Sequence, residues 1–319
     1  MPDGARPATL PIIDLAPLAE GEAGEARVAA AIHAACTGPG FFYVANHGVP
    51  EPVIRTATEA ARRFFHLPAE VKRNTKANMV HRGWHAAGGA VMKGAKKPDL
   101  KEFYSMGLDL AADHPAVLAG EKLRGPNQWP AELPELKPAF EAYFAAIGAA
   151  GAMLLRAVAV SLGLPREFFA PHYRLPLQRT QAIFYPPQPP EDDDQFGLAA
   201  HTDFGCITLL WQDDSGGLEV RERQSGNWIP APPIPGTLVV NVGDLLGRWS
   251  NDRFASTPHR VRNLSGHERM SIATFYDPDF AAPIDPRALG ATAPHYAPTT
   301  AGAHILACFD AAFAYRKQG

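Results

Sequence analysis

Apolar residues that recur every three or four positions predict four helices in this chain. In residues 22–37, for example, Val28, Ile32 and Ala35 share one face, and Gly38-Pro39-Gly40 ends the pattern. The longest of these segments is rich in alanine and carries no evident chemistry, which is typical of a helix that supports a sheet. The four predicted helices are residues 22–37, 50–66, 134–163 and 301–317.

Short apolar runs between Gly- and Pro-rich turns predict strands in the rest of the chain. In the second half they follow one another closely, without the helices that parallel strands need as connections. Such a pattern favours a fold of the α+β class with a mainly β core, closed as a double-stranded β-helix (jelly roll) with flanking helices. The predicted strands are residues 10–15, 41–45, 178–185, 198–204, 206–212, 218–222, 237–242, 259–263 and 268–276.

Composition narrows the class of protein further. The 319 residues are 46% hydrophobic, enough for one large domain or two small ones, and the net charge of −3 gives no basic field for nucleic acid or anionic lipid. The longest uncharged apolar stretch, 14 residues from Ala142 to Leu155, is shorter than a bilayer span. The three cysteines are widely spaced, which fits reduced thiols better than a disulfide framework. The first residues show no signal-peptide pattern, so we expect a soluble, cytoplasmic protein with no membrane partner.

The strand predicted at 198–204 contains a candidate metal site. His201 and Asp203 are two residues apart and would project from the same face of an extended strand. His259 follows the loop from Ser250 to Pro258 and would supply a second imidazole. Two imidazoles and one carboxylate that leave the opposite positions open are the ligand set of non-haem Fe(II) sites. A His-x-Asp pair alone is a weak signal, because an isolated strand histidine is more often a hydrogen-bonded core residue.

Arg269 and Ser271 begin ten residues after His259 and form a second pair of residues two apart. On a strand they would point to the same face. An arginine fork holds a carboxylate through two parallel hydrogen bonds, and a hydroxyl two residues away can add a third. The alternative is an ordinary ion pair between Arg269 and a surface acid such as Asp277. Metal ligands followed by a carboxylate clamp are far less common by chance than either part alone.

Together these residues and several further blocks resemble a known family. It is the iron(II)- and 2-oxoglutarate-dependent dioxygenases related to isopenicillin N synthase, which include plant flavonoid and gibberellin oxygenases. The resemblance covers most of residues 9 to 281. It rests on Pro11-Ile12-Ile13-Asp14-Leu15, Gly40-Phe41-Phe42-Tyr43-Val44-Ala45-Asn46-His47-Gly48, Tyr185-Pro186-Pro187, His201-Thr202-Asp203-Phe204-Gly205, Gly216-Gly217-Leu218, Asn241-Val242-Gly243-Asp244, Ser256-Thr257-Pro258-His259-Arg260-Val261 and Arg269-Met270-Ser271.

The resemblance implies an enzyme that uses Fe(II), 2-oxoglutarate and O2 to oxidise a small organic substrate, by hydroxylation or desaturation, with release of succinate and CO2. It assigns the iron ligands to His201, Asp203 and His259. Arg269, Ser271 and Tyr185 would bind the distal carboxylate of 2-oxoglutarate. The implied organisation is an N-terminal dioxygenase region (9–125), a scaffold helix (126–174), a jelly-roll core (175–281) and a C-terminal extension with a helix (282–319), all in one structural unit.

The resemblance also implies substrate-contacting positions. The strongest is Phe275, six residues after Arg269 and on the same strand face, and the others are Phe204, Gln181, Tyr104, His81, Trp84 and His85. The chain departs from the plant pattern in having Ile183 where an asparagine orients the metal-bound end of 2-oxoglutarate. Gln181 replaces a residue that is often basic, which argues against an acidic substrate group there.

Other polar segments are predicted to be ordinary. Lys93 to Lys101 and the acidic stretch from Pro186 to Gln195 are expected to be solvated loops. His47 is expected to belong to a structural turn. His81 and His85 have a spacing that could bind zinc on a helix, but Gly83 between them argues against a helix there.

Two alternatives stay open at this point. Isopenicillin N synthase and the aminocyclopropane-carboxylate oxidases carry the same Arg-x-Ser pair and oxidise their substrates at iron without 2-oxoglutarate. A non-catalytic jelly-roll module that binds a metal or a small ligand is the other possibility. The sequence names neither the substrate nor the oligomeric state.

Overall fold

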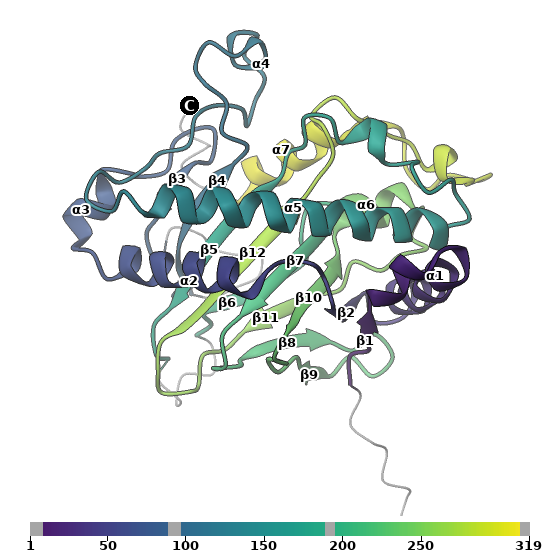
Figure 1. The fold of residues 1–319 in the computed structure, drawn as a ribbon, viewed down its shortest axis with the longest axis horizontal. Coiled ribbons are helices and arrows are strands. Elements are labelled where there is room, and N and C mark those ends of the chain that lie inside the picture. The colour runs from purple at the N-terminus through teal and green to yellow at the C-terminus, as the bar shows by residue number, and fades with distance from the viewer. Residues whose placement is uncertain (1–8, 89–96, 189–194, 313–319) are drawn as a thin grey trace, which may run out of the picture.

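A computed structural model describes residues 9–88, 97–188 and 195–312 of the chain. Two β-sheets form its centre, and we call them the larger and the smaller sheet (Figure 1). The larger sheet has the strand order β1-β2-β10-β7-β12-β5-β4-β3, and the smaller has the order β6-β11-β8-β9. The larger sheet contains β1 (Ile12–Asp14), β2 (Phe41–Ala45), β3 (Gly83–His85), β4 (Glu102–Gly107), β5 (Arg179–Tyr185), β7 (Ile207–Gln212), β10 (Thr237–Val242) and β12 (Arg269–Tyr276).

The smaller sheet contains β6 (Leu198–His201), β8 (Leu218–Arg221), β9 (Trp228–Pro230) and β11 (His259–Val261). A separate hairpin pairs β13 (Pro283–Ile284) with β14 (Thr299–Thr300). Neighbouring strands run antiparallel, apart from the parallel pair β1 and β2. From β5 to β12 the chain passes back and forth between the two sheets, apart from the neighbouring strands β8 and β9 of the smaller sheet, and this gives the predicted jelly roll.

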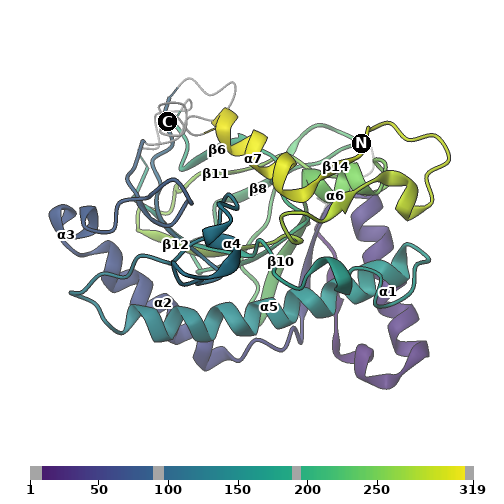
Figure 2. The same cartoon turned by 90° about the horizontal axis from the view of Figure 1, so that it is seen from above.

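Helices cover the outer face of the larger sheet. In Figures 1 and 2, α2 (Glu51–Phe65) and α5 (Leu136–Ser161) run side by side across this face, with α1 (Glu22–Thr37) at one end. The remaining helices are α3 (Ala69–Arg73), α4 (Pro115–Leu118), α6 (Asp244–Trp249) and α7 (Ala301–Ala312), with 3₁₀ turns at 16–20, 170–172 and 286–289.

By length and composition alone, α5 is apolar enough to cross a membrane. In this structure it serves as a core helix, because its buried side chains, including Phe140, Ile147 and Leu154, pack among α1, α2 and the sheet. Its Gly151 approaches the larger sheet so closely that a Cβ there would lie 2.7 Å from the ring of Tyr276. The helix therefore sets the position of β12 from behind.

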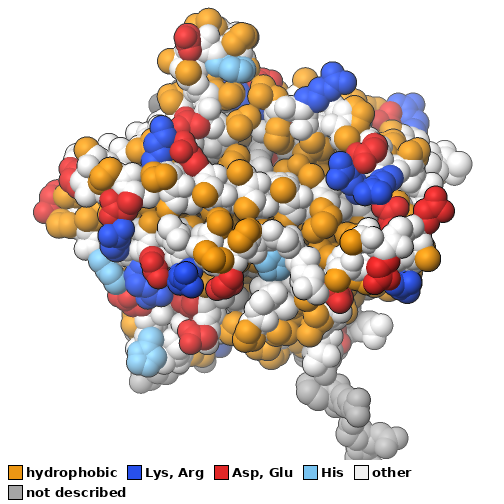
Figure 3. Space-filling model, in the orientation of Figure 1, with side chains coloured by type: hydrophobic (Ala, Val, Ile, Leu, Met, Phe, Trp, Pro, Cys, Tyr) orange, Lys and Arg blue, Asp and Glu red, His pale blue; other side chains and the backbone are white. Residues whose placement is uncertain are grey.

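The surface over these helices carries charges of both signs. Figure 3 shows Lys and Arg interspersed with Asp and Glu, and hydrophobic side chains between them. No area of one sign dominates the face seen there. This face therefore offers no broad basic patch of the kind that binds nucleic acid.

The helices and most strands lie within a few residues of their predicted limits, but three expectations fail. β6 ends at His201, so Asp203 lies in the following loop and not on the strand. The prediction did not include the short elements α3, α4, α6, β3, β4, β9, β13 and β14. Asp99 and Lys101 are buried immediately before β4, and Gln188 is buried too, so the predicted solvated loops are wrong at these positions. Residues 93–96, 189–194 and 313–317 lie outside the described part.

Candidate active site

The predicted metal ligands meet between the two sheets. His201 is the last residue of β6 and pairs with His259, the first residue of β11. Asp203 reaches the same point from the loop after β6, so that its Oδ1 lies 3.7 Å from Nε2 of His201 and 3.8 Å from Nε2 of His259. One ligand atom from each residue lies within 4.8 Å of the others. These three atoms could coordinate one metal ion.

Hydrogen bonds orient each of these groups toward the shared point. Nδ1 of His201 lies 2.9 Å from the carbonyl oxygen of Ala199, and Nδ1 of His259 lies 3.3 Å from that of Thr257. Since a carbonyl only accepts, Nδ1 carries the proton in both rings and Nε2 keeps its lone pair for a metal.

Asp203 divides its two oxygens in the same way. Its Oδ2 accepts hydrogen bonds from Thr208 Oγ1 at 2.6 Å and from Asn241 Nδ2 at 2.8 Å, which leaves Oδ1 facing the imidazoles. Both donors come from strands of the larger sheet, β7 and β10. The carboxylate is therefore held between the sheets with one oxygen free to coordinate.

The site favours deprotonated ligands. Burial, followed by the neighbouring His259, lowers the pKa of His201 to about 3, so its ring is neutral near pH 7. Burial acts to raise the pKa of Asp203, but the two imidazoles and the hydrogen bonds from Asn241 and Thr208 outweigh it and leave the pKa lowered. Neutral imidazoles and an ionised carboxylate are the forms that bind a divalent metal.

A cavity opens from the metal site along the larger sheet. Its empty volume is about 530 Å³, including open solvent at the mouth. Alternate residues of β5 and β12 face it, as strand geometry requires. Its wall includes Gln181, Ile183 and Tyr185 from β5 and Arg269, Ser271, Ala273 and Phe275 from β12.

Arg269 lies in this cavity with no exposed surface. Its Nε donates to the carbonyl of Gly216 at 2.6 Å and its Nη2 donates to Gln212 Oε1 at 3.1 Å. The guanidinium stacks on the ring of Tyr185, 4.7 Å from the centroid. No carboxylate in the described residues pairs with Arg269, and Asp277 instead binds Arg179 at 2.8 Å. A buried cation with neutral partners only is suited to an incoming carboxylate.

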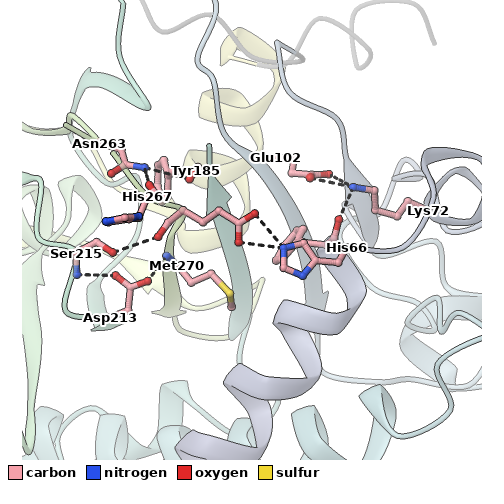
Figure 4. A network of polar contacts seen from close by, with 11 residues as sticks. His66, Lys72, Glu102, Tyr185, Asp213, Ser215, Asn263, His267 and Met270 are labelled. Carbon is pink, nitrogen blue, oxygen red and sulfur yellow. Dashed lines mark hydrogen bonds and ion pairs between the residues drawn. The ribbon is translucent and has the colours of Figure 1, made fainter. Parts of the chain in front are cut away.

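Backbone contacts fix the start of β12, where Arg269 stands (Figure 4). Asp213 accepts from the backbone N–H of Met270 at 2.6 Å, and Ser215 donates to the carbonyl of Glu268 at 3.2 Å. The Glu268 carboxylate in turn lies 3.0 Å from Nε2 of His66, at the end of α2. These contacts hold both sides of Arg269, so its side chain enters the cavity from a fixed backbone.

Tyr185 is similarly confined. Asn263 donates to its carbonyl oxygen at 3.2 Å, as Figure 4 shows. A Cβ at Gly197 would lie 2.8 Å from the Tyr185 ring, so the absence of a side chain at Gly197 makes room for the ring. Register pairs Tyr185 with Arg269 across β5 and β12. The predicted trio of Arg269, Ser271 and Tyr185 is therefore together on one face.

The predicted substrate positions divide by sheet face. Phe275 and Gln181 line the cavity, and His81 lies beside them with its Nε2 3.3 Å from Gln181. Phe204 packs against Phe309 of α7 at a centroid distance of 6.1 Å, next to the cavity. His81 and His85 are also neighbours, at 4.6 Å, but His85 is in β3 and not on a helix.

Tyr104 and Trp84 do not meet the expectation. They face each other across β4 and β3, on the side of the sheet that packs against the helices. The Tyr104 hydroxyl donates to the carbonyl of Gln128, and the Trp84 indole donates to Glu102 at 2.5 Å. Successive residues of a strand point to opposite faces, and in β4 it is Phe103, not its neighbour Tyr104, that points to the cavity side.

Several cavity residues were missed. Lys101 lines the cavity although its segment was expected to be solvated. Phe41 of β2 packs edge-on against His259, with ring centroids 5.0 Å apart. Thr208 and Asn241 support Asp203. Asn241 belongs to a block that carried the resemblance, whereas residues 101–105 show no alternation of apolar and polar side chains that would have placed Lys101 on the face of Phe103.

Comparison with known proteins identifies the family. Residues 10–132 match the model of the N-terminal region of non-haem dioxygenases in morphine synthesis, and residues 175–278 match the 2OG-Fe(II) oxygenase superfamily. The chain is 34% identical to the 2-oxoglutarate-Fe(II) type oxidoreductase hxnY of Emericella nidulans over 98% of this chain and 94% of the relative.

Solved structures agree with the sequence matches. A full-length Neurospora crassa protein in complex with alpha-KG and thymine superposes with a TM-score of 0.83, at 30% identity, over 95% of this chain and 96% of that one. JOX2 in complex with 2OG, Fe and JA gives a TM-score of 0.78 at 31% identity, over 94% and 85%. The predicted fold class and family are thereby confirmed. The chain belongs to the 2-oxoglutarate- and Fe(II)-dependent oxygenases and is an oxidoreductase that uses iron, 2-oxoglutarate and O2.

Proposed function

We propose that His201, Asp203 and His259 hold the iron of this enzyme, and that Arg269, Ser271 and Tyr185 bind the distal carboxylate of 2-oxoglutarate. The convergence of two Nε2 atoms and one Oδ1 atom supports the first assignment. The buried guanidinium of Arg269, in the same cavity and without a carboxylate partner among the described residues, supports the second.

Bound together, iron and 2-oxoglutarate supply the oxidising chemistry, in which O2 oxidises a C–H bond of the substrate while 2-oxoglutarate becomes succinate and CO2. The residues of the chain hold the reactants in place and exclude water. Arg269 fixes one end of the cosubstrate, so the other end meets the metal in a constant orientation. The walls of the cavity decide which C–H bond lies nearest to the metal.

The substrate we propose is a small organic molecule with an apolar or planar body. Thymine in the Neurospora crassa structure and JA in JOX2 are small molecules in similar structures. Here Phe275 and Gln181 line the cavity and His81 and Phe204 border it, which offers aromatic surface with an amide to orient a polar group. The outcome we expect is hydroxylation or desaturation.

Anaerobic titration with Fe(II) and then 2-oxoglutarate tests the site, since the metal–2-oxo acid complex absorbs visible light. Asp203→Ala is expected to bind no iron. Arg269→Ala is expected to bind iron but to lose roughly 2–5 kcal/mol of cosubstrate binding, the usual effect of removing one partner of a buried charge pair. Asp14→Ala, which removes an exposed carboxylate outside the cavity, is the control and should titrate like the parent protein.

Succinate release provides the functional measurement. It should depend on 2-oxoglutarate, on iron and on O2, and should rise when a substrate is present. Oxygen consumption with a substrate but without 2-oxoglutarate would contradict the proposed role of Arg269. It would favour iron chemistry of the isopenicillin N synthase kind.

We further propose that the protein works in a reducing compartment such as the cytoplasm. Cys36, Cys206 and Cys308 are all free thiols, and Cys36 and Cys206 are buried. Fractionation of the source cells tests this. Recovery with secreted proteins would contradict it.

A further inference from the structure

Asp244 lies outside the metal cavity, in a surface hollow that it shares with Ser256. It follows β10 as the first residue of α6, and its side chain is half-buried. Its Oδ2 accepts a hydrogen bond from Thr202 Oγ1 at 3.0 Å, and its Oδ1 accepts one from Ser256 Oγ at 2.6 Å. Both oxygens are therefore engaged by hydroxyl groups, and these come from positions 54 residues apart in the chain (256 − 202).

Each of the two hydroxyl groups belongs to a segment that carries metal ligands. Thr202 stands between His201 and Asp203, and Ser256 stands three residues before His259. The Thr202 side chain turns to its carboxylate partner while both of its neighbours face the shared metal point. One carboxylate thus connects the two segments whose side chains must meet at a single ion.

The pairing of β6 with β11 is irregular beside these ligands. His259 pairs with His201, but the next pair is Val261 with Leu198, where a regular antiparallel ladder would place Ala199. An irregularity of this kind bends a strand and interrupts its ladder of hydrogen bonds. The ladder is therefore a weak restraint on the distance between the two imidazoles, and the shared carboxylate adds a second one.

The backbone at the start of α6 holds the loop after β6 as well. The N–H of Asp244 donates to the carbonyl of Asp203 at 2.7 Å. A Cβ at Gly243 would lie 2.2 Å from the carbonyl oxygen of Gly205, so the two backbones approach too closely for a side chain there. The start of α6 thus supports the loop of Asp203, and the carboxylate of Asp244 extends this support to the segment of His259.

The surroundings of Asp244 differ from those of a core residue. The hollow around it has an empty volume of about 710 Å³, including open solvent, and is also lined by Arg248, Tyr296 and His304. Water can therefore replace the lost acceptor for either hydroxyl group when Asp244 is shortened. We expect such a variant to fold, so that its effect on metal binding can be measured.

We propose that Asp244 is a positioning residue of the metal centre, which joins Thr202 to Ser256 and thereby sets the spacing of the three metal ligands. The inference rests on the iron site of the proposed function. The role differs from that of Asn241, which orients one carboxylate, because Asp244 restrains two backbone segments relative to each other. A link of this kind is lost when either of its two hydrogen bonds is removed.

The first test is the Fe(II) affinity of the metal-free protein, measured anaerobically by competition with a chelator. Asp244→Ala is expected to raise the Kd about tenfold or more, as removal of groups that orient metal ligands does. Asp244→Asn should stay within a few fold of the parent protein, because its amide can accept from one hydroxyl group and donate to the other. Asp14→Ala is the matched control, since Asp14 also accepts two hydrogen bonds, from Asn46 and from the N–H of Ala16.

Removing the two hydroxyl groups separately distinguishes a link from local support. Thr202→Val and Ser256→Ala should each weaken Fe(II) binding as much as Asp244→Ala does. The double variant should be within about twofold of either single variant, because a link that is cut once is already lost. If each hydroxyl group supported only its own segment, the two losses would multiply to about a hundredfold, and that outcome would overturn the link.

Co(II) in place of iron reports the geometry of the ligands through its visible d–d absorption. We expect the band to shift in Asp244→Ala, Thr202→Val and Ser256→Ala. It should keep its position in Asp244→Asn and Asp14→Ala. Unfolding of the metal-free proteins by denaturant gives the comparison with stability. A residue that only stabilised the fold would lower the unfolding midpoint and leave the Co(II) spectrum unchanged.

The outcomes are distinct. If the parent protein binds neither Fe(II) nor Co(II), the proposed iron site itself falls. If the parent and Asp14→Ala bind both metals and Asp244→Ala matches them in Kd and spectrum, only the role of Asp244 is overturned. If Asp244→Ala does not fold, Thr202→Val and Ser256→Ala keep the carboxylate and decide the question in the same way.

Discussion

The two carboxylate oxygens of Asp203 have different roles in this site. One carboxylate oxygen accepts hydrogen bonds from Thr208 and Asn241, and the other faces His201 and His259. Without those donors the carboxylate could rotate or bind a metal through both oxygens. The two donors therefore matter for metal affinity although neither is a ligand.

Asn241→Leu tests this arrangement. The substitution keeps the shape of the side chain and removes the donor, so Fe(II) affinity is expected to fall about 10- to 100-fold. Competition against a chelator measures it, and Thr208→Val should give a loss in the same direction. Asn227→Leu, at an exposed turn, serves as the control. Unchanged affinity in both Asn241→Leu and Thr208→Val would show that Asp203 is oriented by other means.

His85 predicts a dependence of stability on pH. Burial, followed by the charge of Lys101, lowers the pKa of His85 to about 3, from about 6.5 in an unfolded chain. Below about pH 6.5 the unfolded state therefore binds a proton that the folded state does not, and stability falls as the pH drops toward 3. The contribution of His85 is fully present above pH 6.5.

His85→Phe keeps a ring against Phe103, on which His85 stacks at 4.0 Å, and removes the titration. Melting temperatures of the apo-proteins between pH 7 and pH 4 should fall less steeply for the variant than for the parent. His201 titrates in both proteins, so the comparison isolates His85. Parallel curves would mean that His85 binds its proton equally well in the folded and the unfolded protein.

At the scale of elements, helices and strands with a periodic apolar pattern could be predicted from the sequence. Short strands that depend on pairing with distant segments could not. α1, β2 and β10 match their predicted limits, because their apolar patterns are long and regular. β3 and β4 are defined by pairing with each other and with β5, which local sequence does not reveal. Missing β4 had two consequences: Lys101 was interpreted as solvated, and Tyr104 was placed on the cavity side instead of Phe103.

The metal site was predictable for a different reason. Order along the chain identified His201, Asp203 and His259 although Asp203 lies beyond the end of β6. The same-face argument for a strand was thus wrong in detail, while the residues do converge. Residues that support the site without a motif of their own, such as Phe41 and Thr208, could be found only after the strands were placed against one another.

The contact between α5 and β12 gives a prediction about packing. Gly151→Ala improves helix propensity by about 1 kcal/mol but inserts a methyl group 2.7 Å from Cγ of Tyr276, whose ring stacks on Tyr173. We expect a net loss of stability of about 1–3 kcal/mol in chemical denaturation. In a Tyr276→Leu background the same substitution should be neutral or stabilising. A Gly151→Ala protein more stable than its parent would show that α5 can move away from the sheet.

At the scale of the whole molecule, the larger sheet is built from both halves of the chain. β2 lies between β1 and β10, and β4 lies between β3 and β5. Removing residues before 175 would expose the edges of β10 and β5 and the apolar face that α2 and α5 cover. The jelly-roll strands alone therefore lack part of their own sheet.

We accordingly expect a fragment of residues 175–281 to be unfolded or aggregated. Circular dichroism and limited proteolysis measure this, with the full chain as the control. Co-expression with residues 1–174 should recover soluble material by pairing β2 with β10 and β4 with β5. A fragment that melts cooperatively on its own would contradict this account of the sheet.

The pairing of β2 with β10 also sets an order of events during synthesis. Ala45 finds its partner Thr237 only after 192 further residues (237 − 45) have been made. Until then the apolar segment Phe41–Ala45 has only the three-residue strand β1 as a partner, and its other edge is exposed to other chains or to chaperones. Phe41 is also the ring that packs on His259, so the pocket for the metal is completed late. Iron loading is therefore an event of the finished polypeptide, and the nascent chain must be kept from aggregating until its last strands are released.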